Sequence, residues 1–257
     1  MINALTITSC KRLKHFEKTI SSFHKHCKDL DIIDLILWYD DSSSIIDRTE
    51  MMKILLSYFN GKKIISTFFF PNSFNSGKRH KEIMNIWKFD LSRLLLDYVF
   101  HTEDDFEYIK DFYIGEAIEL LKSNDDVAAV GFSQEKRDIP PELGKINIKG
   151  NFWEWFYLKD RPICDGLFFD TVIMKKHPDP TYWCKYINWP YFGFRPGIHD
   201  VKKLEKLNGF SDVEIKGSFE LEFAVRFSEL YKSFFHVDEI CKHIGDISAY
   251  DLNKSSR

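Results

Sequence analysis

The chain has 257 residues, with 36 basic and 39 acidic side chains and a formal net charge of −3 at pH 7. Hydrophobic residues make up 44 %, which is enough for one sizeable core and argues against a largely disordered chain. The near-balance of charge argues against a dedicated nucleic-acid-binding domain, which is normally basic. No apolar run approaches the roughly 20 residues that cross a membrane, and the N-terminus lacks a signal-peptide pattern, so we expect a cytoplasmic protein.

Five widely spaced cysteines, without a Cys-x-x-Cys pair, favour free thiols in a reducing compartment over a zinc cluster or a disulfide framework.

The first 133 residues alternate short apolar runs with amphipathic segments. Five apolar runs predict strands at 4–9, 35–39, 63–69, 98–102 and 127–132. Apolar residues spaced three and four apart predict helices between them, at 13–27, 45–59, 83–95 and 114–121. This alternation predicts an α/β fold in which helices flank a mostly parallel sheet.

The alternation ends near residue 134. The stretch from there to about 215 is rich in loops, prolines and aromatic residues. A helix is expected from about Ser218, a short strand near 234–237 and a tail from Glu239.

The second predicted strand is followed by Tyr39-Asp40-Asp41-Ser42-Ser43. Asp and Ser are good caps for the helix that comes next. The same carboxylates are also placed to accept a hydrogen bond from a nucleobase or a ribose, and both interpretations stay open.

Gly77-Lys78-Arg79-His80 comes just before the next helix. Glycine permits a close backbone approach, a helix N-terminus favours anions, and two cations suit a diphosphate. A solvated basic turn explains the residues equally well.

Four carboxylates fall within five residues in His101-Thr102-Glu103-Asp104-Asp105-Phe106-Glu107, with no cation before Lys110. Because strand side chains alternate, Glu103 and Asp105 are expected to point one way and Asp104 the other. Such crowding is unfavourable unless a positive group is present, and Mg²⁺ or Mn²⁺ would satisfy it. The carboxyl end of a parallel strand is also where open α/β sheets bind ligands. The alternative is a solvated acidic turn before a helix.

The late helix carries Glu220 and Glu222 in its first turn. Glu222 lies four residues before Arg226, which predicts a stabilising pair. Glu220 has no such partner and is a candidate general base, although acids are common in the first turn of helices. Nearer the C-terminus, His243 becomes a site residue if the tail folds back onto the acidic cluster.

Taken in order, these residues resemble a nucleotide-sugar glycosyltransferase of the GT-A fold across nearly the whole chain. The matching positions are Thr8-Ser9 with Arg12, Asp40-Asp41, Gly77-Lys78-Arg79, Glu103-Asp104-Asp105, the acid of the late helix and His243-Ile244-Gly245. His101 to Phe106 looks like the "LEDDW" form of the DxD motif in small family-2-like transferases. The chain departs from that pattern with Glu103 as the first acid, and with Phe219-Glu220 where the family has two acids.

The resemblance implies a role for each matched residue. Thr8, Ser9, Arg12 and Asp41 would line the nucleoside pocket, with Asp41 facing the N3–H of uracil. Lys78 or Arg79 would face the diphosphate. Asp105 would bind Mn²⁺ or Mg²⁺ directly, with Asp104 and Glu103 around it, and His243 would complete the site.

The resemblance further implies that Glu220 deprotonates a hydroxyl of the acceptor in an inverting transfer from a UDP-sugar. Glu222 stays the alternative base, and its spacing to Arg226 favours Glu220. The acceptor would be a carbohydrate or another hydroxyl compound, and no nucleic acid is expected as a partner.

One catalytic domain over residues 1–257 is expected, with a nucleotide-sugar half at 1–133 and an acceptor half with the tail at 134–257. Most aromatic residues of the second half, such as Trp153 and Trp183, are expected to form a small core, and some could line the acceptor site. A nucleotidyltransferase is less well matched, because the segment Thr8 to Arg12 has no glycines. An inactive binding module is the other alternative, and the intact acid set argues against it. The sequence leaves the sugar, the acceptor and the oligomeric state open.

Overall fold

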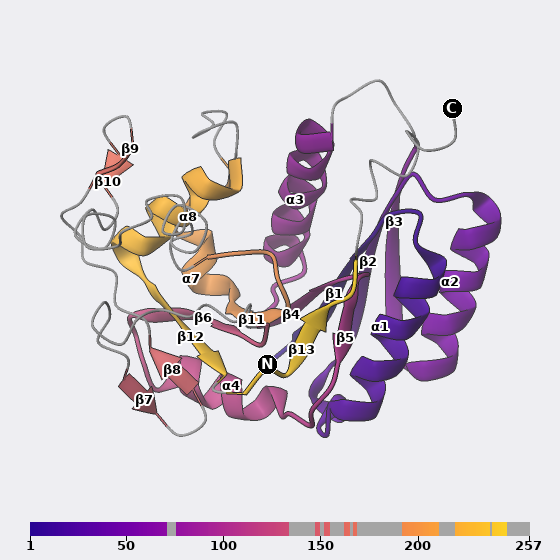
Figure 1. Ribbon diagram of the computed structural model, residues 1–257, viewed down its shortest axis with the longest axis horizontal. Coiled ribbons are helices and arrows are strands. Elements are labelled where there is room, and N and C mark those ends of the chain that lie inside the picture. The colour runs from indigo at the N-terminus through magenta and orange to yellow at the C-terminus, as the bar shows by residue number, and fades with distance from the viewer. Residues whose placement is uncertain are drawn as a thin grey trace, which may run out of the picture.

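The computed structural model describes residues 1–70, 76–133, 147–149, 152–154, 162–164, 167–168, 192–210, 219–236 and 238–245. Within these residues, a nine-stranded sheet lies between helices on both of its faces (Figure 1). None of the described helices combines the length and apolarity needed to span a membrane.

The central sheet takes strands from both halves of the chain. Its order is β3 (Lys63–Phe69), β2 (Leu35–Asp41), β1 (Asn3–Ser9), β4 (Tyr98–Glu103), β11 (Gly197–Asp200), β6 (Val127–Gly131), β12 (Lys232–His236), β8 (Phe152–Glu154) and β7 (Asn147–Lys149). β1 to β4 are parallel, and so are β6 and β12. β11 is antiparallel to both of its neighbours, β4 and β6. The prediction of a mostly parallel α/β sheet is therefore confirmed.

Two small sheets lie apart from the central one. One pairs β5 (Phe106–Tyr108) with β13 (Cys241–His243), and the other pairs β9 (Pro162–Cys164) with β10 (Leu167–Phe168). The first of them brings the C-terminal segment against the strand that follows the acidic cluster.

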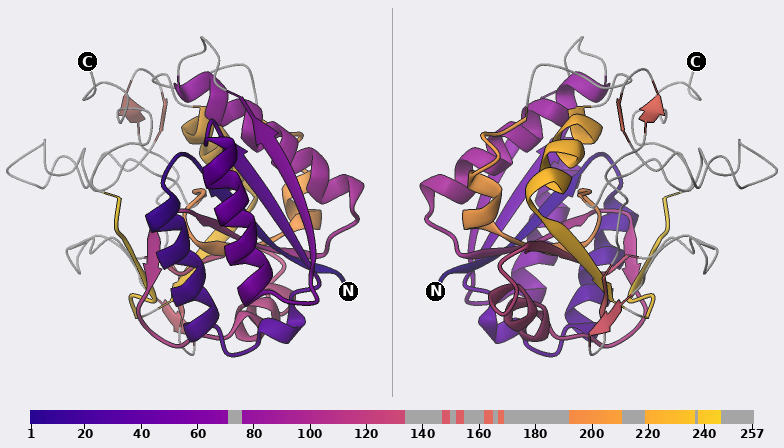
Figure 2. Two further views of the ribbon diagram at one scale, coloured as in Figure 1. Left: turned by 90° about the vertical axis from the view of Figure 1, so that its right-hand side faces the viewer. Right: turned by 90° about the vertical axis from the view of Figure 1, so that its left-hand side faces the viewer.

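The helices form two layers. α1 (Leu13–His26), α2 (Ile45–Tyr58) and α4 (Ile114–Lys122) cover one face of the sheet, and the short η1 (Leu30–Ile32) precedes β2. α3 (Ser76–Arg93), α7 (Val201–Glu205) and α8 (Phe219–Leu230) cover the other (Figures 1 and 2). The alternation of side chains along each strand builds both cores: Ile36 and Trp38 of β2 join the α1 side, whereas Leu35 and Leu37 join the α3 side.

Several elements were not expected from the sequence. β11 and α7 lie in the stretch interpreted as loop-rich, and β5 and β13 are strands of only three residues. Short strands carry too little periodicity to be recognised without their partners. The expected free thiols are found at Cys10, Cys27 and Cys241, which are all buried.

Candidate active site

The carboxyl ends of β1, β2 and β4 meet at one edge of the sheet. Thr8 lies opposite Tyr39 on one side and Glu103 on the other, and Ser9 lies opposite Asp40. The parallel register therefore brings together three groups of predicted site residues that are far apart in the chain: those after β1, after β2 and at the end of β4. Open α/β sheets generally bind ligands at such an edge.

Asp40 organises the loop after β2. Its buried carboxylate accepts hydrogen bonds from Ser9 Oγ at 2.7 Å, Ser43 Oγ at 2.6 Å and Arg48 Nε at 2.7 Å. The backbone at Ser42 has a φ of 63°, a left-handed conformation that costs a non-glycine residue free energy and that the surrounding bonds maintain. Asp40 is thus a scaffold residue, and Ser9, predicted to line the nucleoside pocket, is bonded to it.

Asp41 and Thr8 lie next to this network. Asp41 is buried and accepts a hydrogen bond from Ser42 Oγ at 2.7 Å. Thr8 is half-buried at the end of β1. Their predicted contacts with a nucleoside stay predictions.

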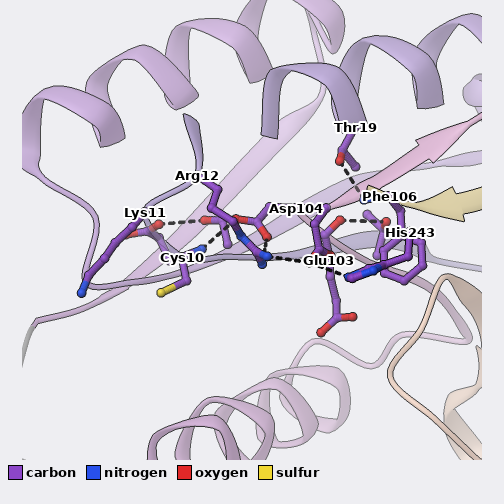
Figure 3. A network of polar contacts seen from close by, with 12 residues as sticks. Cys10, Lys11, Arg12, Thr19, Glu103, Asp104, Phe106 and His243 are labelled. Atoms are coloured by element: carbon purple, nitrogen blue, oxygen red, sulfur yellow. Dashed lines mark hydrogen bonds and ion pairs between the residues drawn. The ribbon is translucent and has the colours of Figure 1, made fainter. Parts of the chain in front are cut away.

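The acidic cluster is arranged differently from the alternation expected of a strand. β4 ends at Glu103, and Asp104 and Asp105 form the turn to β5, so both can face the same group. Arg12 Nη2 donates to Asp104 Oδ1 at 2.5 Å, and Arg12 Nη1 donates to Asp105 Oδ2 at 2.6 Å. Glu103 points away from Arg12 and Asp104 (Figure 3). The expectation that Asp104 and Asp105 point to opposite sides was wrong, because β4 ends at Glu103 and both carboxylates bond Arg12.

Arg12 is the positive group that the crowded carboxylates require. Although burial lowers its pKa, the carboxylates of Asp104 and Asp105 outweigh that effect, and the pKa of Arg12 is raised. Burial raises the pKa of Asp104 to about 7, against the opposing effect of Arg12. The guanidinium of Arg12 is held by the acidic turn. Its predicted contact with a nucleoside stays a prediction.

Asp105 retains one unused acceptor. Its Oδ1 atom is buried and has no hydrogen-bond partner among the described residues. Buried carboxylate oxygens are normally bonded, and leaving one without a partner costs about 1–3 kcal/mol or more. An unpaired hard oxygen on an otherwise bonded carboxylate fits a divalent cation of the Mg²⁺ or Mn²⁺ type. Within the described part of the chain, no three His, Cys, Asp or Glu side chains are arranged as a complete metal site.

The C-terminal segment does fold back onto this cluster. His243 Nε2 lies 3.0 Å from Asp105 Oδ2, and the backbone N–H of Ile244 donates to the carbonyl of Asp105 at 2.7 Å. A Cβ on Gly245 would lie only 2.6 Å from Asp105 Oδ2, so glycine is needed for this close approach. An ionised carboxylate only accepts, so Nε2 of His243 is the donor of this bond when Asp105 is ionised.

Glu220 lies near Glu103. Burial, together with the negative charges of Asp105 and Glu220, raises the pKa of Glu103 to about 8. Glu220 Oε1 accepts a hydrogen bond from the Phe194 N–H at 3.2 Å. Burial raises the pKa of Glu220 to about 7, so a carboxylate on α8 can gain a proton near neutral pH.

The carboxylate of Glu222 is bonded to Arg226, as the spacing of the two residues predicted. Arg226 Nε donates to its Oε1 at 2.6 Å, and Arg226 Nη2 donates to its Oε2 at 2.8 Å. The remaining donors of Arg226 bond the carbonyls of Leu207 and Gly209. This two-bond arrangement fixes Glu222 as part of the scaffold and leaves Glu220 as the carboxylate of α8 nearer the acidic cluster.

Some predicted residues fall outside the description. The backbone of Lys78 and Arg79 belongs to the start of α3, but their side chains lie outside the described residues. The side chains of most aromatic residues of the second half, including Trp153 and Trp183, also lie outside the described residues. Phe192 is described, and it is a core residue that contacts Phe223.

Sequence reasoning missed two residues that shape the site: Arg48 neutralises Asp40, and Phe194 holds Glu220. Gly245 was recognised as part of His243-Ile244-Gly245, and the structure adds that it lets the tail approach Asp105.

No protein-family model matches the chain, and no curated protein matches it. Solved structures do match. The mannosyltransferase PcManGT from Pyrobaculum calidifontis, in complex with GDP-Man and Mn²⁺, aligns over 98 % of this chain with a TM-score of 0.60 and 13 % identity. TarS 1–349 of S. aureus in complex with UDP-GlcNAc aligns over 96 % with a TM-score of 0.53 and 11 % identity.

The alignments cover 59 % of the mannosyltransferase chain and 62 % of the TarS chain, so this chain spans about three fifths of each. A further crystal structure of TarS 1–349 gives a TM-score of 0.52 at 13 % identity. At such identities the likeness shows the fold. The chain shares the fold of these glycosyltransferases, and the acidic turn after β4 lies at the carboxyl ends of its parallel strands.

Proposed function

We propose that the chain is a metal-dependent glycosyltransferase that moves a sugar from a UDP-sugar to a hydroxyl group of a carbohydrate or similar acceptor, with inversion at the anomeric carbon. The observation that carries the proposal is Asp105, whose buried Oδ1 has no partner among the described residues while its Oδ2 is bonded to Arg12. The glycosyltransferase fold supports it.

Asp105 would hold Mn²⁺ or Mg²⁺, with His243 beside it and Asp104 and Glu103 around the site. A bound divalent cation would stabilise the negative charge of the departing diphosphate. Of the neighbours, the mannosyltransferase complex contains Mn²⁺, which supports a metal here without locating it.

Thr8, Ser9 and Asp41 would contact the nucleoside, and Lys78 or Arg79 the diphosphate. The complex of TarS with UDP-GlcNAc supports a uridine donor. The complex of the mannosyltransferase with GDP-Man makes a guanosine donor the first alternative to test.

Glu220 would accept the proton of the acceptor hydroxyl. The acceptor oxygen then bonds to the anomeric carbon as the bond from that carbon to the diphosphate oxygen breaks, and the proton stays on Glu220. A pKa of about 7 leaves Glu220 largely ionised at slightly alkaline pH and still basic enough to take the proton.

The test measures donor hydrolysis and melting temperature with a panel of UDP- and GDP-sugars. UDP should raise the melting temperature of the wild type only with Mn²⁺, because the metal joins protein and diphosphate. Asp105→Ala should abolish that coupling and retain the fold, whereas Asp111→Asn, a change at an exposed carboxylate, should not affect it. Equal stabilisation by UDP in the presence of a chelator would contradict the metal-bridged site.

A further inference from the structure

We propose that Arg12 is a built-in counter-cation of the acidic turn, which makes binding of a divalent cation depend on a nucleoside diphosphate. The inference rests on the proposed function, because it concerns the same carboxylates. It assigns to Arg12 a different role from the nucleoside contact implied by resemblance.

The geometry places one guanidinium across two carboxylates. Arg12 Nη2 lies 2.5 Å from Asp104 Oδ1, and Nη1 lies 2.6 Å from Asp105 Oδ2. The second oxygen of Asp104 accepts from the backbone N–H of Cys10 at 2.9 Å. Among the carboxylate oxygens of the two residues, Asp105 Oδ1 is therefore the one buried atom without a partner in the described chain.

Arg12 is held in this place by its own backbone. It is the residue before α1, and its carbonyl accepts the N–H of Phe16 at 2.9 Å. Lys11, just before it, has a left-handed φ of 58°, and its N–H donates to Ser43 Oγ at 2.8 Å. The chain is thus pinned on both sides of Arg12, which directs its side chain to the acidic turn.

Two nearby lysines of the described chain bond a different carboxylate: Lys18 and Lys242 both contact Glu107, at 3.0 and 3.2 Å. Arg12 is the guanidinium that bonds Asp104 and Asp105, and of these two carboxylates His243 contacts that of Asp105. Lys18 lies on α1, the helix that begins directly after Arg12, and carries the same charge as Arg12. It therefore provides a charge-matched control.

The charges then decide the order of binding. The two carboxylates of Asp104 and Asp105 and the guanidinium of Arg12 together carry a single negative charge, which attracts a divalent cation only weakly. A cation bound there would also lie close to the positive charge of Arg12, which repels it. A diphosphate brings further negative charge that both cations can face, so metal and nucleotide stabilise each other. By linkage, each should raise the affinity of the other by the same factor.

The experiment measures Mn²⁺ binding by calorimetry, with and without UDP, for the wild type, Arg12→Gln and Lys18→Gln. The wild type should bind Mn²⁺ weakly alone and far more tightly with UDP. Arg12→Gln should bind Mn²⁺ alone at least about tenfold more tightly than the wild type, because a nearby cation is removed. The gain in Mn²⁺ affinity on adding UDP should shrink, and Lys18→Gln should behave as the wild type.

Unchanged or weaker Mn²⁺ binding by Arg12→Gln overturns the inference, and so does an equal gain in Lys18→Gln. If Arg12→Gln does not fold, Arg12→Lys replaces it, since a lysine bonds one carboxylate less tightly than a two-pronged guanidinium and should give a smaller gain. Absence of Mn²⁺ binding by all variants, even with UDP, instead contradicts the proposed metal site itself.

Discussion

Arg48 Nε lies 2.7 Å from Asp40 Oδ2, and the side chains are 7 % and 0 % exposed. Of the two adjacent acids after β2, the one that supports the loop is therefore Asp40. Breaking a buried ion pair by removing one partner leaves the other charge buried and unpaired.

Asp40→Ala should accordingly lower the free energy of unfolding by about 3–5 kcal/mol. Asp41→Asn should lower the free energy of unfolding by less than about 1 kcal/mol, because the amide keeps a hydrogen-bonding oxygen, and it should weaken UDP binding. Urea denaturation and UDP titration with Mn²⁺ separate the two effects. A destabilised Asp41→Asn with normal UDP affinity would reverse the two roles.

Glu220→Gln should lower sugar transfer by roughly 10²–10⁴-fold, the usual effect of losing a general base, and leave UDP–Mn²⁺ binding nearly intact. Glu222→Gln should instead lower the free energy of unfolding by about 1–3 kcal/mol, because it weakens a partly buried, two-bond pair with Arg226. Steady-state rates and urea denaturation check both. Transfer at the normal rate by Glu220→Gln would assign the base to another carboxylate, and a retained anomeric configuration would reject direct inversion.

The pKa of Glu220 near 7 predicts the pH dependence of transfer. Because the base acts only when ionised, kcat/KM should rise with pH through about 7 and then level off. The same pKa shift predicts that the stability of the fold changes with pH in the opposite direction to kcat/KM. The folded state holds a proton that the unfolded state has already lost, so the stability that Glu220 contributes at acid pH is lost as pH rises through 7. Both trends should be absent from Glu220→Gln, and a rate profile that is identical in the variant would contradict the assignment.

Gly245→Ala should weaken UDP–Mn²⁺ binding more than it lowers the stability of the metal-free protein. Its Cβ would meet Asp105 Oδ2 at 2.6 Å and Arg12 Nη1 at 3.0 Å. Gly61→Ala is the control, because its φ of 82° strains alanine although no atom lies within 4 Å of the new Cβ. It should cost about 1 kcal/mol of stability and leave the site unchanged. This pair of variants is cleaner than truncation after Ile240, which would also remove the buried Cys241 and the pairing of β13 with β5.

His199 is buried, and neither of its ring nitrogens has a hydrogen-bond partner among the described residues. Burial lowers its pKa to about 4. The unfolded chain takes up a proton below about pH 6.5, whereas the folded chain does not until about 4, so stability is lost as pH falls between these values. His199→Leu should therefore increase stability by about 1–3 kcal/mol and reduce its loss in acid. Acid denaturation of the two proteins measures this, and a less stable variant would indicate that the ring is bonded.

The first half of the fold could be predicted because each of its strands is an apolar run whose partners follow at regular intervals. β3, predicted at 63–69, has those bounds in the structure. β11 could not be predicted in the same way. It has four residues, follows Pro196 and is defined by bonds to β4 and β6, which precede it by about 70 to 100 positions.

The site shows the same division. The spacing of Glu222 and Arg226 is local, and their pair was predictable. The contact of Arg12 with Asp104 and Asp105 joins residues more than 90 positions apart, and the sequence alone suggested a metal ion where the structure has a guanidinium. The prediction that Asp104 and Asp105 point to opposite sides failed because β4 ends at Glu103, and the end of a strand depends on the turn that follows it.

β11 also has a consequence for how the chain is made. Residues 1–133 include β4 and β6, yet the strand that joins them begins at Gly197. While the ribosome is still synthesising the intervening segment, β4 and β6 each present unpaired backbone groups, which is the condition that promotes aggregation of nascent chains. Because β11 lies between β4 and β6, this part of the sheet can be completed only after Gly197–Asp200 has been synthesised.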